Sequence, residues 1–533
     1  MKKISLSPLL VLLLCATTVW GIPREEPRPA AASTAKSTKK EKVYLLHADS
    51  LTFDAEQSAD YRVLHGNVQF RKDSMYMYCD SAYFYEANNS LDAFSNVRME
   101  QGDTLFIYGD VLYFDGNEQI ARLRDNVRME NRNVTLFTDS LNYEMRPNIG
   151  YFFDGGSIVD EKNELTSLYG QYSPDTKDAI FNFDVVLTNE KYVIYSDTLT
   201  YNTNTKISYL RGPSTIVSDS NTIQTTNGWY DTEADHAMLL DRSLLIGDSR
   251  SLTGDTLYYD RNIGFGEAFG NMRMVDSLQY IIMEGQYGFY NEKTDYAFAT
   301  DSARVMEYSR EDTLYLHADT LLSFVDIDST RIVRAYYGVR FYRVDAQGVC
   351  DSMQYVARDT TLSMYGNPIM WSGNQQILGD TIRLFFNDST IDWAHVINSW
   401  KEGPYYDQMS GNEMKSFFEG GEMRRIETSG NVLTIFFPQE EDSTLIGMFN
   451  ADASFLNIFL KDNKMDKMIM WPLVTGRMYP MEKLRKGLIY LPRYKWYEAE
   501  RPKDQYDIYR KTSSSVGATD STDVRTPGHK FNL

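Results

Sequence analysis

The feature that most constrains this chain is an internal repeat with a period of about thirty residues. Its first landmark is a Gly, Ser or Asp residue, often followed by Asn and Val, as in Gly66-Asn67-Val68. The ten intervals between Gly66 and Gly366 average thirty residues. Because one such unit cannot bury its own apolar face, the units are expected to stack. Copies of this landmark begin at Gly66, Ser95, Asp125, Gly155, Asp184, Gly212, Asp241, Gly270, Asp301, Gly338 and Gly366.

A second landmark alternates with the first at nearly the same period. It has the form Asp, Ser or Thr, Leu, any residue and then an aromatic residue, as in Asp139-Ser140-Leu141-Asn142-Tyr143. Two interleaved landmarks with one period indicate a regular array. The clear copies begin at Asp49, Asp80, Asp110, Asp139, Asp197 and Asp255, and weaker copies begin at Asp319, Asp351 and Asp380.

Alternation of apolar and polar residues predicts that each unit contains two strands of about ten residues, with turns at the Gly, Asn and Asp clusters. Leu112 and Phe114 share one face, whereas Arg98 and Glu100 take the opposite one. Aromatic residues make up 14% of the chain, which favours strands. Because no useful helical period occurs between Val43 and Ile391, helical solenoids are excluded. We expect an elongated all-β stack, either a jelly roll or a solenoid.

The two ends of the chain differ from the array. Residues 1–21 have the layout of a secretory signal peptide: Lys2 and Lys3, an apolar run, and small residues up to Gly21. Lipidation of Cys15 is the alternative, but Leu14 is a poor match to a lipoprotein signal. We predict a flexible leader over 22–42, repeats over 43–300, a second repeat module over 301–435, a capping region over 436–510 and a disordered tail over 511–533.

The charge argues against nucleic-acid partners. The chain has 54 Lys and Arg residues against 74 Asp and Glu residues, a net charge of −20, and loss of Lys2 and Lys3 with the signal peptide makes it −22. Nucleic-acid binding relies on neutralising phosphates with Lys and Arg.

With no further stretch of about 18 apolar residues, the product is expected to be periplasmic, either free or peripheral at the outer membrane. Cys79 and Cys350 either pair or stay buried as free thiols, which is the simpler reading.

The sequence contains no recognisable catalytic constellation. The six histidines lack metal-ligand spacing, and no phosphate loop or nucleophile elbow is present. We therefore expect no enzyme activity, no cofactor and no metal site. The repeated aspartates could form a calcium-binding ladder, but hydrogen bonding to backbone N–H groups at turns is favoured. Likewise, the Arg98/Glu100 and Arg128/Glu130 pairs are read as cross-strand ion ladders in preference to a headgroup-docking edge.

The apolar face has two readings that periodicity does not separate. In one, it is a packed core. In the other, the two sheets splay apart along the stack and leave a groove for acyl chains.

The paired motifs resemble a known family. Ala48-Asp49-Ser50-Leu51 followed by Leu64-His65-Gly66-Asn67-Val68 is similar to the OstA-like domains of lipopolysaccharide-transport proteins of Gram-negative bacteria, and the resemblance extends over about 43–431. The C-terminal stretch around Arg477-Met478-Tyr479-Pro480 and Arg501-Pro502 resembles the ending of large Bacteroidetes-type members.

The resemblance implies a slit-like β-jelly roll that shields the acyl chains of lipid A without catalysis. It also implies bridging of inner- and outer-membrane transport proteins by edge-to-edge strand addition. The inner face would bind the lipid through Leu51, Phe53, Val68, Phe70, Ala82, Phe84, Val97, Met99, Leu112, Phe114, Val127, Met129, Leu141 and Tyr143.

Three functional hypotheses follow. The first is a periplasmic carrier of lipopolysaccharide toward the outer membrane, which needs an open slit and free sheet edges. The second is a structural or adhesive cell-envelope solenoid with a closed core. The third is a carbohydrate-active β-helix enzyme, which needs a cluster of acidic residues in one cleft.

Overall fold

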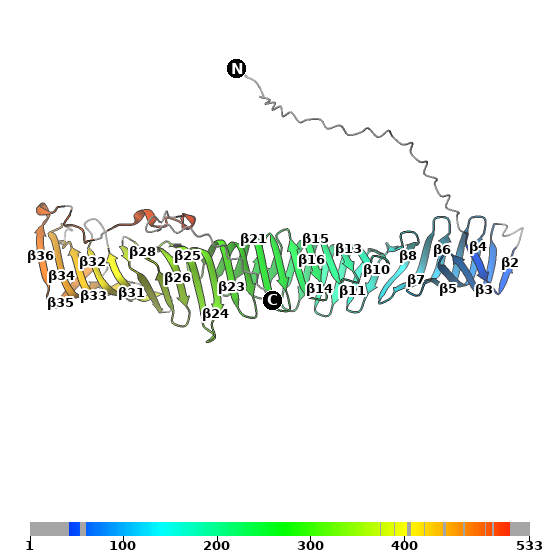
Figure 1. Ribbon diagram of the computed structural model, residues 1–533, viewed down its shortest axis with the longest axis horizontal. Helices are drawn as coiled ribbons and strands as arrows, with labels where there is room; N and C mark the ends of the chain where they lie inside the picture. The colour runs from blue at the N-terminus through cyan, green and yellow to red at the C-terminus, as the bar shows by residue number, and fades with distance from the viewer. Residues whose placement is uncertain are drawn as a thin grey trace, which may run out of the picture.

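The computed structural model shows a long rod built almost entirely of strands (Figure 1). It describes residues 42–511 except 54–59, 374, 388–389, 402–406, 420–421, 441–443, 462–463, 486 and 493–494. Its 36 strands form one hydrogen-bonded sheet in which every pairing is antiparallel. The described residues contain three short 3-10 helices and no α-helix. The predicted elongated all-β fold is confirmed.

The first half of the array contains β1 (Tyr44–His47), β2 (Ser50–Thr52), β3 (Arg62–Lys72), β4 (Met75–Tyr85), β5 (Ser90–Gln101), β6 (Leu105–Asp115), β7 (Ile120–Asn131), β8 (Val134–Glu144), β9 (Ile149–Phe152), β10 (Gly156–Val159), β11 (Asn163–Ser167), β12 (Tyr169–Tyr172), β13 (Asp178–Asn189), β14 (Tyr192–Asn202), β15 (Ile207–Ser218), β16 (Thr222–Asp231), β17 (His236–Leu240) and β18 (Leu244–Ile246).

The second half contains β19 (Arg250–Thr253), β20 (Thr256–Asp260), β21 (Phe265–Asp276), β22 (Ile281–Asn291), β23 (Tyr296–Glu307), β24 (Leu314–Val325), β25 (Arg331–Arg343), β26 (Ala346–Val356), β27 (Thr361–Tyr365), β28 (Ile369–Ser372), β29 (Gln375–Leu378), β30 (Thr381–Asn387), β31 (Thr390–Lys401), β32 (Gln408–Glu419), β33 (Glu422–Phe436), β34 (Gly447–Lys461), β35 (Lys464–Trp471) and β36 (Thr475–Pro480), followed by η1 (Met481–Lys483), η2 (Glu498–Glu500) and η3 (Asp507–Tyr509).

The landmarks at Gly66-Asn67, Ser95-Asn96 and Gly270-Asn271 are bulges in the middle of strands, which corrects the prediction that they are turns, whereas Gly366-Asn367 lies in the break between β27 and β28. Between β5 and β6 the register passes from Phe94 opposite Val111 to Val97 opposite Gly109, so that two residues of β5 face one of β6. The two extra residues, Ser95 and Asn96, have φ values of 61° and 51°. Two successive left-handed residues bend a strand without reversing it, and Gly and Asn tolerate that conformation best.

The landmark aspartates lie opposite these bends. Asp80, Asp110, Asp139 and Asp197 stand in the middle of strands and not at turns as predicted, whereas Asp49, Asp255 and Asp380 lie in breaks directly before β2, β20 and β30. Their carboxylates accept hydrogen bonds from landmark asparagines on the neighbouring strand. The Nδ2 to Oδ2 distance is 2.6 Å for Asn126 and Asp110, and 2.8 Å for Asn271 and Asp255. The partner in these pairs is a side-chain amide, whereas Asp139 accepts from the backbone N–H of Asn126 at 3.4 Å. Among the described residues no cluster of three His, Cys, Asp or Glu side chains could hold a metal ion.

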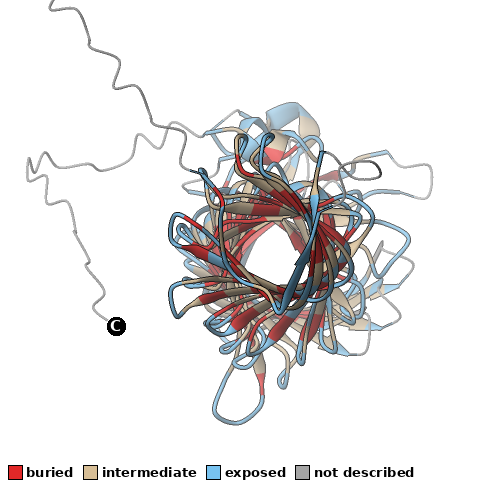
Figure 2. Cartoon of the chain, turned by 90° about the vertical axis from the view of Figure 1, so that its right-hand side faces the viewer, coloured by how far each residue is buried: buried red, intermediate tan, exposed pale blue. Residues whose placement is uncertain are grey.

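Strands bend or break at the same place on successive coils, so the single sheet folds into two walls around one interior (Figure 2). Wall A contains half-strands such as 90–94 and 111–115, and wall B contains half-strands such as 97–101 and 105–109. The strands reverse at two rims opposite the bend: rim A has turns such as 116–119 and 203–206, and rim B has turns such as 102–104. The gap between the rims is the mouth of the array.

The inner faces of both walls form one apolar core. Leu112 and Phe114 are buried, while Tyr113 between them is 45% exposed, which confirms the alternation expected from the sequence. A single cluster of buried residues runs from Val43 to Leu456. The rod therefore has one continuous interior.

The long repeat interval between Asp301 and Gly338 coincides with two longer connections, residues 308–313 and 326–330. The strands on both sides of these connections, β23 to β26, continue the same antiparallel pairing.

After β36 the chain turns back along the outside of the rod (Figure 1). The described part of residues 484–511, here called the strap, binds wall B through glutamine side chains. Gln408 donates to the Ile489 carbonyl at 2.8 Å and accepts from the Leu491 N–H at 2.9 Å, and Gln376 accepts from the Tyr497 N–H at 2.9 Å. Both glutamines alternate with inward-facing Ile377 and Met409, so the strap covers the outer face of the wall.

The predicted signal peptide and all of the leader except Lys42 lie outside the described residues, as does the tail beyond Lys511. Within the described residues, none of the helices has the length and apolar character needed to cross a membrane.

The bend can be tested at Asn126, whose φ is 53° and whose amide binds Asp110. Asn126→Gly loses the hydrogen bond but keeps the backbone freedom, whereas Asn126→Ala loses both. We expect the Ala variant to be less stable than the Gly variant by about 1 kcal/mol. Amide hydrogen exchange in β6 and β7 measures this difference. Equal exchange in the two variants would contradict the role of the left-handed backbone.

Candidate functional site

Twelve of the fourteen residues predicted to line the inner face are buried in the interior. They are Val68, Phe70, Ala82, Phe84, Val97, Met99, Leu112, Phe114, Val127, Met129, Leu141 and Tyr143. Whether they contact lipid stays a prediction.

The other two residues, Leu51 and Phe53, are exposed by 48% and 57%. Leu51 pairs with the inward-facing Leu64, so β2 presents it toward the interior, and Phe53 follows directly after β2. Both are exposed because β2 belongs to the first coil that the structure describes, and no described coil covers that coil. Phe53 lines a cavity of about 560 Å³ at this end, together with Tyr61, Arg62 and Phe84.

Over the first two thirds of the array the interior is filled by side chains. Leu112, Leu141, Phe181, Leu210 and Ile216 have no exposed surface. An acyl chain therefore has no room in this conformation, since protein cores pack at crystal-like density. A ligand can enter this section only if the walls separate.

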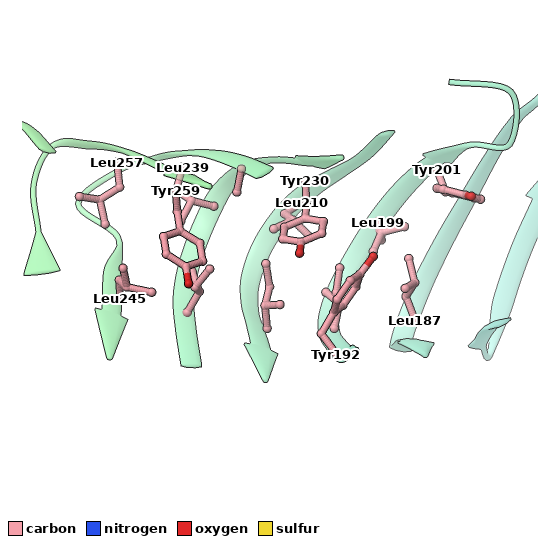
Figure 3. Packing of buried hydrophobic residues seen from close by; sticks show 14 of the residues in the cluster. Leu187, Tyr192, Leu199, Tyr201, Leu210, Tyr230, Leu239, Leu245, Leu257 and Tyr259 are labelled. Atoms are coloured by element: carbon pink, nitrogen blue, oxygen red, sulfur yellow. The ribbon is translucent and has the colours of Figure 1, made fainter. Parts of the chain in front are cut away.

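A column of tyrosines follows the inner side of rim A (Figure 3). Tyr143, Tyr172, Tyr201, Tyr230 and Tyr259 recur every 29 residues, one on each coil, and all are buried. Tyr143, Tyr201 and Tyr259 are the last residues of the second sequence landmark, and Phe84 and Phe114 hold that position in two earlier copies. The column places a phenol, an apolar ring with a polar tip, beside the mouth on successive coils.

Most of these hydroxyls are bonded across the mouth to residues of rim B, in contacts here called rim bridges. Tyr143 donates to Gln101 Oε1 at 3.0 Å, and Tyr172 donates to Asn131 Oδ1 at 3.2 Å. Further bridges of this kind join Tyr201 to Asp160 and Asn163, Asn221 to Tyr259 and Arg250 to Tyr290.

Charged side chains add further rim bridges. The Lys206 ammonium lies 2.8 Å from the Asp160 carboxylate, and Arg250 lies 2.9 Å from Asp295. Other bridges join Lys177 to Asn131 and Lys191 to Asp235. Earlier coils are joined by Val43 with Asn89 and by Gln119 with Asp73, so non-covalent polar contacts close the mouth from Val43 to Asp295.

Asp160 is the most enclosed carboxylate of the rim bridges, with no exposed side-chain surface. Burial raises its pKa, but hydrogen bonds from Lys206, Tyr201 and the backbone N–H groups of Lys162 and Asn163 outweigh that effect. Its pKa is therefore held below the ordinary value of 3.8. The pKa of Tyr201 is raised, first by burial and then by its bond to Asp160. Both groups thus keep the forms that bond to each other at neutral pH.

The arginine and glutamate residues on the outer face pair along a strand and not across strands as predicted. Arg98 lies 3.0 Å from Glu100 on the same strand, and its guanidinium lies 4.5 Å from the centre of the Tyr78 ring on the neighbouring strand. Arg128 repeats both contacts with Glu130 and Tyr108. Because Arg98 and Arg128 are nearly half exposed, these pairs contribute little to stability.

The two cysteines of the described chain, Cys79 and Cys350, are both buried and free. Burial raises the pKa of the Cys79 thiol to about 12 and also raises the pKa of Cys350. Neither thiol is therefore an activated nucleophile.

Sequence reasoning identified the apolar lining but missed the rim bridges. Their rim B members, Gln101, Asn131, Asp160, Asn221 and Arg250, follow the same period as the landmarks. Their regular spacing was the only signal in the sequence that could have revealed them. It was missed because these residues differ in type and lie outside both landmarks.

The fold and site together define a slit-type β-array with an apolar interior. A family model described as OstA-like protein matches residues 40–197, which extends from before β1 into β14. The resemblance seen in the motifs is therefore confirmed for this part of the chain. No curated protein matches the chain.

The rim bridges can be tested with Tyr201→Phe, which removes a buried hydroxyl bonded to Asp160. We expect the free energy of local opening at the turns 160–162 and 203–206 to fall by about 1–3 kcal/mol, because the buried Asp160 carboxylate loses a hydrogen-bond donor. Amide hydrogen exchange measures this opening. Tyr230→Phe is the matched control, because the Tyr230 hydroxyl makes no hydrogen bond. Equal effects of the two variants would argue against a bridging role.

The Asp160 bridge also predicts a pH dependence. A carboxylate whose pKa is lower in the folded state stabilises that state above its unfolded pKa and loses this contribution as pH falls through the folded pKa. We expect the open population of the turn at 160–162 to be constant from pH 7 to about pH 4 and to increase below about pH 4. Asp160→Asn should remove that acid-induced increase. Hydrogen exchange at several pH values, corrected for intrinsic rates, checks this, and an unchanged profile in the variant counts against it.

Proposed function

We propose that this protein is a periplasmic lipopolysaccharide-binding transport protein that carries its ligand from the inner toward the outer membrane without catalysis. The OstA-like match over residues 40–197 carries this proposal. It is supported by the continuous apolar interior and by the non-covalent closure of the mouth. The signal-peptide pattern of residues 1–21 supports export.

The energy balance favours binding of acyl chains by separation of the walls. Burying one CH₂ group contributes about 0.8 kcal/mol, so a chain of about twelve carbons gains about 10 kcal/mol. Breaking one rim bridge costs about 1–3 kcal/mol. One acyl chain thus offsets the opening of several coils, and the bridges reform when it leaves.

The charge distribution is consistent with a ligand whose head stays outside. With a net charge of −20, the protein does not attract an anionic glycolipid over long distances. Affinity must rest on the acyl chains. Lys191 and Lys162 lie at the mouth with most of their side chains exposed, and they place local positive charge where sugars and phosphates would remain.

Both ends of the rod offer free strand edges to partner proteins. Among the residues that the structure describes, β1 and β2 pair only with β3 at one end, and β35 and β36 pair only with β34 at the other. Apolar side chains are exposed there, including Leu46, Leu51, Trp471 and Met478. These edges fit strand addition by inner- and outer-membrane lipopolysaccharide-transport proteins.

A second candidate function is a structural cell-envelope scaffold whose core stays closed. The observation in its favour is the filled interior between Val97 and Leu257, where inward-facing side chains have almost no exposed surface. This alternative requires that the walls never separate.

Photo-crosslinking in cells distinguishes the two functions. A photoreactive amino acid at Met99 or Phe114, both buried, should give lipopolysaccharide adducts, and the same group at the half-exposed Arg98 should give none. Adducts at the inner positions alone support transport. A folded, exported protein with no adduct at Met99 or Phe114 supports the scaffold.

A further inference from the structure

The coil that carries Tyr230 departs from the repeat at the mouth. Where a strand begins after the rim B turn, the coils on both sides carry Asn163 and Asn221, each bonded to the tyrosine of the column that faces it. The coil between them carries Tyr192 at this position, 29 residues from each asparagine. A phenol thus replaces the bridging amide, and the Tyr230 hydroxyl has no rim bridge.

Two further positions break the repeat on the same stretch of rim A. Thr203 and Thr232 open successive rim A turns, and each hydroxyl donates to a backbone carbonyl of the preceding turn. Arg261 holds this position on the next turn, 29 residues after Thr232. Ser208 stands where the residues 29 positions before and after it are both alanine. Each of the three departures adds hydrogen-bonding groups to the mouth.

The three departures meet at one place. The centres of the Tyr192 and Tyr230 rings lie 4.8 Å apart, and the two side chains extend from opposite ends of their strands (Figure 3). The Arg261 guanidinium lies over the Tyr192 ring, 5.4 Å from its centre. Ser208 is directly opposite Tyr230 in the register of β15 and β16, and neither has exposed surface. These four side chains are here called the Arg261 cluster.

The Arg261 cluster contains donors that have no acceptor. Nε and Nη2 of Arg261 and the hydroxyls of Tyr192, Tyr230 and Ser208 are buried and make no hydrogen bond among the described residues. Arg261 also lies close enough to lower the pKa of Tyr230, although burial is the larger effect and raises it. Buried polar groups normally find a partner, and a guanidinium can only donate. The partner that fits is therefore a group rich in acceptors.

The charges around the cluster leave Arg261 free for such a group. Asp235 on the neighbouring rim A turn is paired with Lys191 of rim B. Glu292 on the following rim A turn interacts with Arg261 and Arg250, but burial is the larger effect and raises its pKa. No carboxylate among the described residues lies within ion-pair distance of Arg261.

A phosphate group matches these donors. Its oxygens accept several hydrogen bonds, and charge-assisted bonds from arginine to phosphate are short and strong. The cluster lies at the mouth, next to the apolar interior at Leu199 and Leu210 (Figure 3). A phosphate bound there has space for acyl chains beside it once the walls separate. This is the arrangement of a phosphorylated lipid.

We propose that the Arg261 cluster is a phosphate-binding site that holds the headgroup phosphate of the transported lipid. When the walls separate, Tyr192 of rim B moves away from Arg261, Tyr230 and Ser208 of rim A, and the phosphate enters between them. It then forms the polar contact across the mouth that this coil lacks. The lipid as source of the phosphate rests on the proposed function, whereas free phosphate has the same chemistry.

The test compares two forms of one lipid. The purified full chain is titrated with rough-type lipopolysaccharide, or with the same lipopolysaccharide after enzymatic removal of its phosphates, in identical detergent micelles. Displacement of a fluorescent acyl-chain probe measures the affinity. The unmodified protein should bind the phosphorylated form about tenfold more tightly, because charge-assisted hydrogen bonds are made only with that form.

Variants that restore the repeat show whether the cluster causes this preference. Arg261→Thr should lower the affinity for the phosphorylated form to that for the dephosphorylated form and leave the latter unchanged. Ser208→Ala should reduce the preference by about threefold, and it guards against misfolding of the first variant. Arg211→Thr is the matched control, because Arg211 is exposed on the outer face of β15, and it should keep the full preference.

Inorganic phosphate distinguishes the two sources. It should compete with phosphorylated lipopolysaccharide and not with the dephosphorylated form, and Arg261→Thr should abolish the competition. Direct binding of inorganic phosphate that depends on Arg261, with equal affinities for the two lipids, would assign the site to free phosphate and overturn its role in holding a headgroup.

The outcomes also separate the site from the proposed function. An unchanged preference in Arg261→Thr, with no binding of inorganic phosphate that depends on Arg261, overturns the site and leaves lipid transport standing. Binding of inorganic phosphate through Arg261 in folded protein that binds neither form of the lipid overturns lipid transport and keeps the site.

Discussion

The bend in the middle of each strand is the constraint on which the rest of the structure depends. Two residues with positive φ face one residue of the neighbouring strand, and the Asp–Asn hydrogen bond connects adjacent bends. A flat antiparallel sheet of this length would expose one apolar face to water. Because all bends coincide, the same sheet becomes two walls whose apolar faces meet, and the strand reversals gather at two opposed rims. The mouth exists because the bend closes only one side.

The chemistry of the mouth then follows from the residue at each rim position. A phenylalanine at the aromatic position of the landmark, as at Phe84 and Phe114, adds only apolar surface. A tyrosine at that position adds a hydroxyl, which the buried site must satisfy, and residues such as Asn131 and Asp160 on the other rim do so. Polar bridges of this kind hold the walls together but remain reversible. Later coils carry apolar residues such as Leu362 and Phe386 at the rim A ends of their strands, and these pack against the continuous core.

Much of this architecture could be predicted from the sequence. Period, strand content and the inward positions such as Val97 and Leu112 follow from alternation, since side chains on a strand alternate between its faces. The landmark positions were found, but their roles were not: Gly-Asn pairs usually mark turns, and only the register shows that here they bend a strand. Rim bridges were beyond sequence reasoning because their partners lie about forty residues apart and meet only after the walls face each other. The strap was also not foreseeable, because glutamines that bind a returning chain carry no periodic signal of their own.

The central claim is that the walls separate to admit acyl chains. The most direct measurement is the distance between spin labels at Lys162 and Glu233, exposed residues that face each other across the mouth with 4.0 Å between their charged atoms. The account predicts one short distance without lipid and a second, longer population when lipopolysaccharide binds. An unchanged distance in protein with stoichiometrically bound lipopolysaccharide would contradict it.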